Sequence, residues 1–215
     1  MLKISVLASG RGSNFQSIID AVKSGRLNAV ISLLITDNPE AFAIQRAGDN
    51  GISHLVLQPK QFGSKDGYYQ SIADELKKRG VDLVVLAGFM RIIGKPLIDA
   101  FPNRIMNIHP ALLPSFPGLH GQKQARDYGV KISGCTVHFV DAGMDTGPVI
   151  IQAAVPVRDD DTEETLSERI LKFEHKIYPE AIRLFAEGRL EVAGRRVRIK
   201  DSPPDDQGLT SPSLG

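Results

Sequence analysis

Leu83-Val84-Val85-Leu86-Ala87 is the stretch that decides the fold class of this chain. It carries no polar side chain on either face, whereas a strand with one solvated face alternates between apolar and polar residues. A strand of this composition is covered by other elements on both sides, which is typical of the interior of a parallel sheet. The segment 83–87 therefore predicts a central parallel strand.

Strands and helices alternate from the N-terminus up to this strand. Apolar runs predict strands over 4–8, 29–36 and 54–57, and helical spacing of apolar residues predicts helices over 13–22, 41–50 and 65–79. This alternation is typical of a doubly wound α/β sheet. At the first helix, Ser13 and Gln16 match a capping box in which Ser13 is the N-cap residue.

The second half of the chain follows a different pattern. We expect strands over 104–108, 132–140 and 149–157, helices over 122–128 and 162–187, and a terminal hairpin of strands 190–192 and 196–199. The turn at 141–148 predicts that the strands on either side of it pair antiparallel. The expected fold is thus a doubly wound, mostly parallel α/β sheet with helices on both faces and antiparallel additions in the C-terminal half.

Composition excludes several classes of protein. The 215 residues are 42% hydrophobic with a net charge of +1, which suits one domain over 1–200 and gives no basic face for nucleic acid. No window is apolar enough for a membrane span, and the single Cys135 fits a reducing compartment, so we expect a cytoplasmic protein. The histidines lack the spacing of metal ligands, so we expect no metal. The stretch 201–215 is rich in Pro, Ser, Gly and Asp, which predicts a disordered tail.

A candidate catalytic pair stands at the end of the strand over 104–108. Asn107 and His109 flank Ile108, and alternate side chains of an extended chain point to the same face. The prolines that follow forbid a regular helix, so the pair leads into a loop beyond the carboxyl end of the sheet, where open α/β folds bind ligands. Asn can donate to a developing oxyanion, and His can donate or accept a proton near neutral pH.

A candidate anion site lies between the first strand and the first helix, in Ser9-Gly10-Arg11-Gly12-Ser13-Asn14. Glycines let the backbone approach a ligand, and a helix N-terminus offers free N–H groups to a phosphate. The spacing matches neither a P-loop nor a dinucleotide fingerprint. The motif alone is equally consistent with a phosphate site and with an ordinary capped turn.

Two acidic residues have both a structural and a functional interpretation. Asp145 lies among glycines in the turn at 143–148, where Asp is most often a turn former, although a carboxylate near His109 would favour the cationic imidazole. Glu174 lies on the long helix, off the apolar stripe that includes Phe173 and Ile177, so a solvated helix face is its expected surrounding. Cys135 alternates within a strand and is expected to be a small core residue.

Five segments in this order resemble the phosphoribosylglycinamide formyltransferase family, the folate-dependent enzymes of purine biosynthesis. They are 8–14, 86–93, 107–120, 136–148 and 174–179, and the resemblance covers residues 1–199. It implies a single formyltransferase domain over 1–200, with the nucleotide phosphate site in its N-terminal half and the catalytic and folate sites in its C-terminal half.

The resemblance also implies roles for individual residues. Asn107, His109 and Asp145 would be the catalytic residues, Gly12, Ser13 and Asn14 would hold the substrate phosphate, Glu174 would contact glycinamide ribonucleotide, and Met90, Arg91, Ile92, Ile93 and Asn107 would bind the folate. Lys65 stands where the family often has an Arg near the glutamate tail of the folate, which keeps the charge but loses the bidentate fork. Ala111 stands where many relatives have Ser, a change we expect to leave the chemistry intact.

The reaction implied is direct formyl transfer. The substrate amine attacks the formyl carbon of 10-formyltetrahydrofolate, the co-substrate, while Asn107 and protonated His109 stabilise the oxyanion and Asp145 sustains the imidazolium. Both partners are small molecules, and a monomer or a homodimer is compatible with the sequence. The enzymatic alternative is a formyltetrahydrofolate hydrolase, although we expect the regulatory domain of hydrolases and the basic RNA-binding domain of methionyl-tRNA formyltransferases to be absent. A non-catalytic phosphate- or folate-binding module is the remaining alternative.

Overall fold

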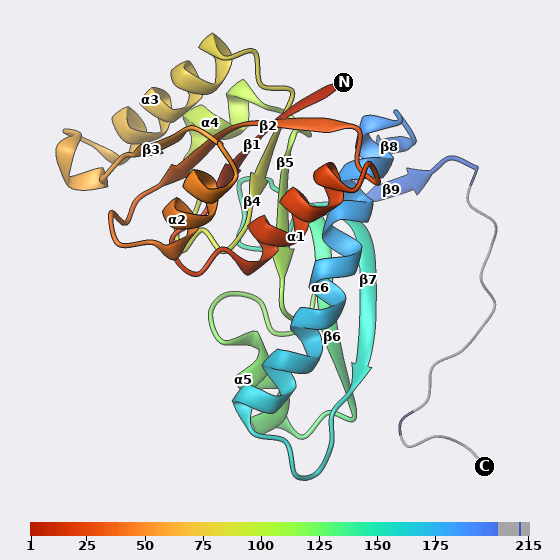
Figure 1. Cartoon of the computed structure of the whole chain (residues 1–215). Coiled ribbons are helices and arrows are strands. Elements are labelled where there is room, and N and C mark those ends of the chain that lie inside the picture. Colours follow the sequence, from red (N-terminus) through yellow and green to blue (C-terminus); the bar gives the residue numbers. More distant parts are fainter. Residues whose placement is uncertain (202–210, 212–215) are drawn as a thin grey trace.

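The strands of the protein form a single twisted sheet, seen in a computed structural model that describes residues 1–201 and 211 (Figure 1). The strands are β1 (Leu2–Leu7), β2 (Ala29–Thr36), β3 (His54–Val56), β4 (Leu83–Leu86), β5 (Ile105–His109), β6 (Ile132–Phe139), β7 (Val149–Pro156), β8 (Leu190–Ala193) and β9 (Arg196–Ile199). The helices are α1 (Ser13–Lys23), α2 (Phe42–Asp49), α3 (Lys65–Lys78), α4 (Lys95–Ala100), α5 (Gly121–Tyr128) and α6 (Glu163–Ala186), with a 3-10 turn at Pro59–Gln61. Apart from residues 201 and 211, the tail expected over 201–215 lies outside the described residues.

The sheet order is β3-β2-β1-β4-β5-β6-β7-β9-β8. The first five strands in this order are parallel, and β4 is an interior strand between β1 and β5, as the apolar segment 83–87 predicts. From β5 onward the pairing changes, because β6 is antiparallel to both β5 and β7. The mostly parallel sheet with antiparallel additions in the C-terminal half is therefore confirmed.

Helices cover both faces of the parallel half. One core joins alternate strand residues such as Val6 and Val85 to α1, α2 and α6, and the other joins residues such as Leu7 and Val84 to α3 and α4. Neighbouring residues of one strand thus enter different cores, which is why these strands have no polar face. Cys135 lies fully buried in a third cluster, between β6, β7 and the start of α6, as expected of a small core residue.

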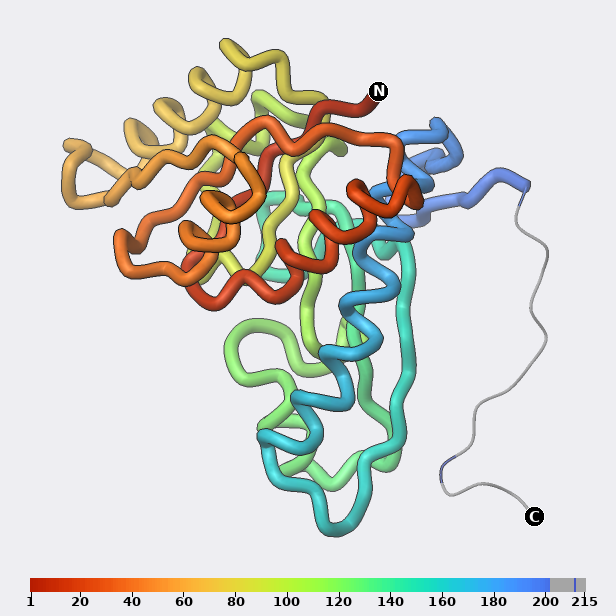
Figure 2. The backbone as a smooth tube through the Cα atoms, viewed as in Figure 1, coloured from red at the N-terminus to blue at the C-terminus, as the bar shows by residue number. Residues whose placement is uncertain are grey.

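The antiparallel strands, α5 and the first half of α6 extend beyond the parallel half of the sheet, as the tube in Figure 2 shows. Helix α6 joins the two parts, since it packs against α1 as well as against β6 and β7. The hydroxyl of Tyr178 donates to the carbonyl oxygens of Leu86 and Met106, at 2.8 and 2.9 Å. This buried side chain ties β4 and β5 to the helix.

Three local features differ from what the sequence pattern predicts. Helix α4 is not predicted, because six residues are too few to display helical periodicity. The terminal hairpin does not stand alone, since β9 pairs parallel with β7 and extends the sheet. The buried side of α6 includes Glu174 and Tyr178, whereas Phe173 and Ile177 are only partly buried.

None of the described helices is long and apolar enough to cross a bilayer.

Candidate active site

Strand β5 presents Asn107 and His109 on the same face of the sheet, as their spacing predicts. Met106 and Ile108 point to the opposite face and pack in the core with α6. The antiparallel register places His138 opposite Asn107 and Thr136 opposite His109, so residues of β6 join the same face. At this position the sheet is covered by the loops that follow β5 and β6 rather than by a helix.

Asn107 is held by its neighbour on β6. Its Nδ2 lies 3.2 Å from Nε2 of His138, and Nδ1 of His138 lies 2.8 Å from the carbonyl oxygen of Phe139. A carbonyl only accepts, so Nδ1 carries the proton of the neutral ring and Nε2 accepts from Asn107. Burial lowers the pKa of His138, which favours this neutral form. The amide of Asn107 is thereby fixed in orientation.

His109 is buried, with 4% of its surface exposed, and both ring nitrogens face oxygen acceptors. Nε2 lies 2.8 Å from the carbonyl oxygen of Phe116, and Nδ1 lies 3.4 Å from Oδ2 of Asp145. Only the imidazolium has a proton for each of these acceptors. The contact to Asp145 is longer than a normal hydrogen bond, so a proton on Nδ1 can also reach a further oxygen acceptor in the site.

Asp145 ties the two covering loops to the β5 pair. Its backbone is left-handed, with φ of 54°, and its Oδ2 accepts from the backbone N–H of Gly118 at 2.8 Å. Its Oδ1 lies 3.5 Å from Nδ2 of Asn107. The structure thus brings Asn107, His109 and Asp145 together, and Asp145 acts here as more than a turn former.

The turn between β1 and α1 differs from the predicted capping box. Gly12, not Ser13, is the N-cap residue, and its φ is 65°. A side chain there would be strained, and its Cβ would lie 2.9 Å from the Cβ of Ala43, so this position requires glycine. No side chain among the described residues caps α1, which leaves the N–H groups of its first turn free for an anion.

Glu174 is buried against α1, so the expectation of a solvated helix face is wrong. Only 6% of its surface is exposed, and its Oε2 accepts from Nδ2 of Asn14 at 2.7 Å. Burial raises the pKa of the Glu174 carboxyl, and the hydrogen bond from Asn14 partly opposes that rise. The buried Oδ1 of Asn14 has no partner among the described residues. This pair therefore offers two polar groups to a ligand beside the glycine turn.

A cavity of about 400 Å³ opens next to this pair. Its lining includes Arg11 from the glycine turn, Gln122 from α5, and Glu174 with three further glutamates from the first turns of α6. One cation and several carboxylates line this cavity, and the free N–H groups of α1 lie next to it, beyond Arg11. This combination suits a ligand that has both an anionic group and hydroxyl or amine donors.

Two residues of these sites, Arg11 and His138, have no role of their own in the sequence prediction, although Arg11 lies within the candidate anion motif. For Arg11 the available signal was its place between the two glycines of the turn. For His138 the signal was the antiparallel pairing expected for the later strands, which places some residue of β6 opposite Asn107. The register that selects His138 depends on the tertiary structure.

The expected folate segment lies at the carboxyl end of β4, beside the glycine turn. The backbone N–H of Met90 donates to Oγ of Ser9 at 3.0 Å, and Arg91 pairs with Asp37. Met90 and Ile92 are exposed large apolar side chains, whereas Ile93 is buried and offers only its backbone.

Lys65 begins α3 near this segment. Its Nζ lies 6.0 Å from the ring centre of Tyr69, whose hydroxyl donates to the carbonyl oxygen of Ile92 at 2.8 Å. The cation of Lys65 therefore lies near the loop that carries Ile92, with Tyr69 between them.

Comparison with known proteins gives one consistent result. A family model described as formyl transferase matches residues 2–182. A phosphoribosylglycinamide formyltransferase of Bacillus subtilis is 45% identical over 85% of this chain and 94% of its own length. The trifunctional purine biosynthetic protein adenosine-3 of Drosophila melanogaster is 46% identical over 86% of this chain, which spans only 14% of that protein.

Solved structures agree with the sequence relatives. Glycinamide ribonucleotide transformylase 1 from Symbiobacterium toebii has 53% identity and a TM-score of 0.92, with 94% of this chain and 95% of that chain covered. A formyltetrahydrofolate deformylase from Pseudomonas syringae has a TM-score of 0.86 but only 25% identity, over 93% of this chain and 66% of its own. Two kinds of enzyme therefore share the fold of this chain.

Proposed function

Since the chain belongs to the formyl transferase family, we propose that it transfers the formyl group of 10-formyltetrahydrofolate to the amine of glycinamide ribonucleotide. The products are formylglycinamide ribonucleotide and tetrahydrofolate, in purine biosynthesis. The observation that carries the proposal is the convergence of Asn107, His109 and Asp145 on one face of the sheet. We assign this activity to a single formyltransferase domain over residues 1–200.

Asn107 and His109 act on the formyl oxygen in this proposal. A C–N bond forms between the substrate amine and the formyl carbon, and the bond from that carbon to the folate nitrogen breaks. Between these events negative charge develops on the formyl oxygen, where the Asn107 amide and the Nδ1 proton of His109 can donate to it. His138 holds the amide in place through the 3.2 Å contact.

Asp145 has two chemical roles in this reaction, one toward the charge of His109 and one in proton transfer. Its carboxylate beside His109 stabilises the imidazolium, and it can relay a proton through water from the attacking amine to the leaving nitrogen. It also holds the backbone of Gly118, so the same carboxylate positions the loop over the site.

The nucleotide substrate fits the cavity beside α1. Its phosphate would bind the N–H groups after Gly12, at Ser13 and Asn14, with Arg11 as an additional cation. Glu174, which also lines this cavity, would accept from a donor of the same ligand. The folate would bind along Met90, Arg91, Ile92 and Ile93, with Lys65 near its glutamate tail.

The experiment that tests the proposal is the absorbance change on release of the deformylated folate, with glycinamide ribonucleotide present and then absent. Turnover that requires the acceptor supports the transferase. Equal turnover without the acceptor would establish the hydrolase instead. Absence of turnover in both assays would leave a non-catalytic binding module and overturn the proposed function.

A further inference from the structure

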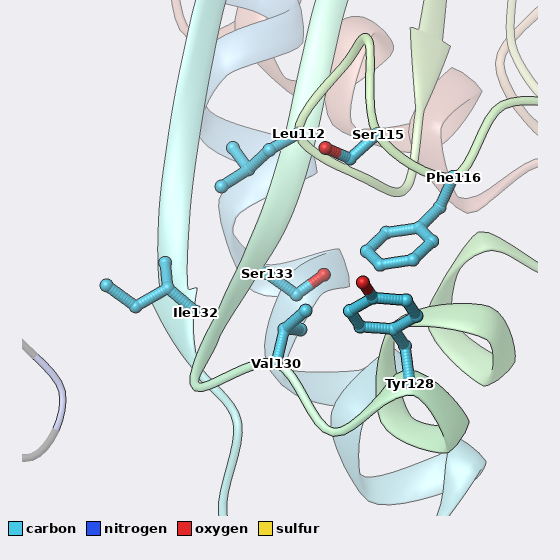
Figure 3. Close-up of a pocket in the computed structure, with 7 residues that line it drawn as sticks. All are labelled: Leu112, Ser115, Phe116, Tyr128, Val130, Ile132 and Ser133. Atoms are coloured by element: carbon cyan, nitrogen blue, oxygen red, sulfur yellow. The ribbon is translucent and has the colours of Figure 1, made fainter.

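A second cavity lies between the loop after β5, the end of α5 and the start of β6. Its volume is about 340 Å³, within the range of small-molecule sites. Figure 3 shows its walls, which include Phe116 from the loop, Tyr128 from α5 and Ser133 from β6. Of these three, only Phe116 also contacts a residue of the proposed formyl transfer, through its backbone carbonyl near His109.

The walls of this cavity have a defined chemistry. Every lining side chain is neutral: Leu112, Val130 and Ile132 are aliphatic, Phe116 and Tyr128 are aromatic, and Ser115 and Ser133 carry hydroxyls. The rings of Phe116 and Tyr128 meet edge to face, with centres 5.9 Å apart. Such a wall favours a flat, uncharged ring over a charged ligand, because a charged ligand would lose its hydration and gain no compensating partner.

Two side chains at this cavity, Ser133 and Tyr128, are poorly matched to their surroundings. Ser133 is 2% exposed, yet its Oγ has no hydrogen-bond partner among the described residues. In Figure 3 its hydroxyl points toward Tyr128 and Phe116. Tyr128 is 79% exposed although aromatic. A buried hydroxyl without a partner is uncommon in native proteins, and a ligand donor or acceptor would satisfy it.

Phe116 connects this cavity to the candidate active site. Its ring lines the cavity, while its carbonyl oxygen lies 2.8 Å from Nε2 of His109. Its backbone is left-handed, with φ of 54°, a conformation that costs free energy for a residue with a side chain. A molecule that packs against the ring therefore acts on the residue that holds the imidazole.

We propose that this cavity is a binding site for a neutral aromatic molecule of one or two rings with a hydrogen-bonding group, and that its occupancy is transmitted through Phe116 to His109. The ring packs on Phe116 and Tyr128, and the polar group bonds to the hydroxyl of Ser133. This site is separate from the proposed formyl transfer, and its binding test does not depend on that activity.

Indole, a neutral two-ring molecule with one N–H donor, is the probe for the full chain, and calorimetry measures its Kd. We expect saturable binding that Tyr128→Leu weakens at least about threefold and Ser133→Ala about three- to tenfold. Phe42→Leu removes an exposed aromatic on α2, away from the cavity, and should leave the Kd unchanged. Benzoate, a charged ring of similar size, should bind more weakly than indole.

A second measurement separates loss of binding from loss of folding. Ser133→Ala without a probe should raise the Tm slightly, because it removes a buried hydroxyl that has no partner. Absence of indole binding, equal binding by all four proteins, or benzoate binding as tight as that of indole would overturn the proposed site.

The link to His109 has its own readout. The ring resonances of His109 in NMR should shift when indole is added to the wild type, and should stay in place in Tyr128→Leu at the same concentration. Indole binding with unmoved His109 resonances would overturn the link, whether or not the protein transfers formyl groups.

Discussion

The amide of Asn14 on α1 donates a 2.7 Å hydrogen bond to the carboxylate of Glu174 on α6, 160 residues further along the chain. Both side chains are buried, and the pair stands beside the cavity that we assign to the nucleotide. A group that costs free energy to ionise is thus kept next to a ligand site, which is common where a carboxylate has a function.

Glu174→Gln should stabilise the free protein at neutral pH. Because the folded pKa of Glu174 lies above its unfolded value, the folded state binds the proton more tightly, and stability falls as pH rises between the two pKa values. The glutamine keeps an oxygen for Asn14 and cannot ionise. Its Tm should therefore exceed that of the wild type by a margin that grows from pH 4 to pH 8. Each kcal/mol gained in the free energy of unfolding should raise the Tm by about 2–4 °C.

The control for this prediction is Glu191→Gln, at an exposed position on β8. Its Tm should follow that of the wild type at each pH. A margin for Glu174→Gln that stays constant with rising pH would show that the carboxylate ionises in the folded state without cost, and a margin that shrinks would show that folding favours the ionised form.

His138→Gln should reduce the loss of stability in acid. Burial lowers the folded pKa of His138 below the unfolded value of about 6.5, so the unfolded state binds the proton more tightly and stability falls as pH drops below that value. The glutamine removes this contribution. Denaturant unfolding measures the free energy of unfolding at pH 7 and at pH 5. The difference between these two values should be smaller for the variant than for the wild type. For the exposed-site control His54→Gln it should equal that of the wild type.

His109→Ala should lower kcat by at least about 100- to 1000-fold, the usual effect of removing one oxyanion donor. Binding of the folate should be largely intact, because the imidazole acts on the charge that develops during the reaction. Steady-state kinetics and folate titration measure the two quantities, with His54→Ala as the control. Near-normal turnover of His109→Ala would contradict its assigned role.

Ser13→Asp should raise the KM for glycinamide ribonucleotide about tenfold or more, since a carboxylate at the N-terminus of α1 repels the phosphate. The KM for the folate should stay within about twofold. Ser24→Asp places the same charge at the other end of α1 and serves as the matched control. If the KM for the nucleotide is unchanged in Ser13→Asp, its phosphate does not bind at this turn.

Thr136→Val should destabilise the protein by about 1–3 kcal/mol and lower kcat. The Thr136 hydroxyl donates to the carbonyl of Ala111 and accepts from the N–H of Leu113 and from Nε2 of Gln152, so all its bonding capacity is used. Valine has the same shape and leaves these buried groups unpaired. Thr136→Ser keeps the hydroxyl and should restore both the free energy of unfolding and kcat, whereas equal losses in both variants would point to packing instead.

Much of the fold was predictable because its signals are local. The apolar run at 83–87 marks a doubly covered strand regardless of what covers it, and the turn at 141–148 requires its flanking strands to reverse direction. Helix α4 and the joining of β9 to β7 were not predictable, because a six-residue helix has no clear period and a single bridge between strands leaves no pattern in either of them.

The candidate site divides in the same way. The sequence by itself determined that Asn107 and His109 share a face, because side chains alternate along any extended strand. It also placed a glycine turn before the first helix, but only the tertiary structure showed that Gly12, rather than Ser13, is the N-cap residue and that Ala43 leaves no room for a side chain there.

Only the tertiary structure decided which distant groups surround that pair. The β5–β6 register selected His138, the packing of α6 on α1 buried Glu174 against Asn14, and the loop conformation brought Asp145 to His109. Strand and helix periodicity depend on neighbouring residues and can be read along the chain. Proximity between residues far apart in sequence depends on how whole elements pack, which the sequence of any one element does not contain.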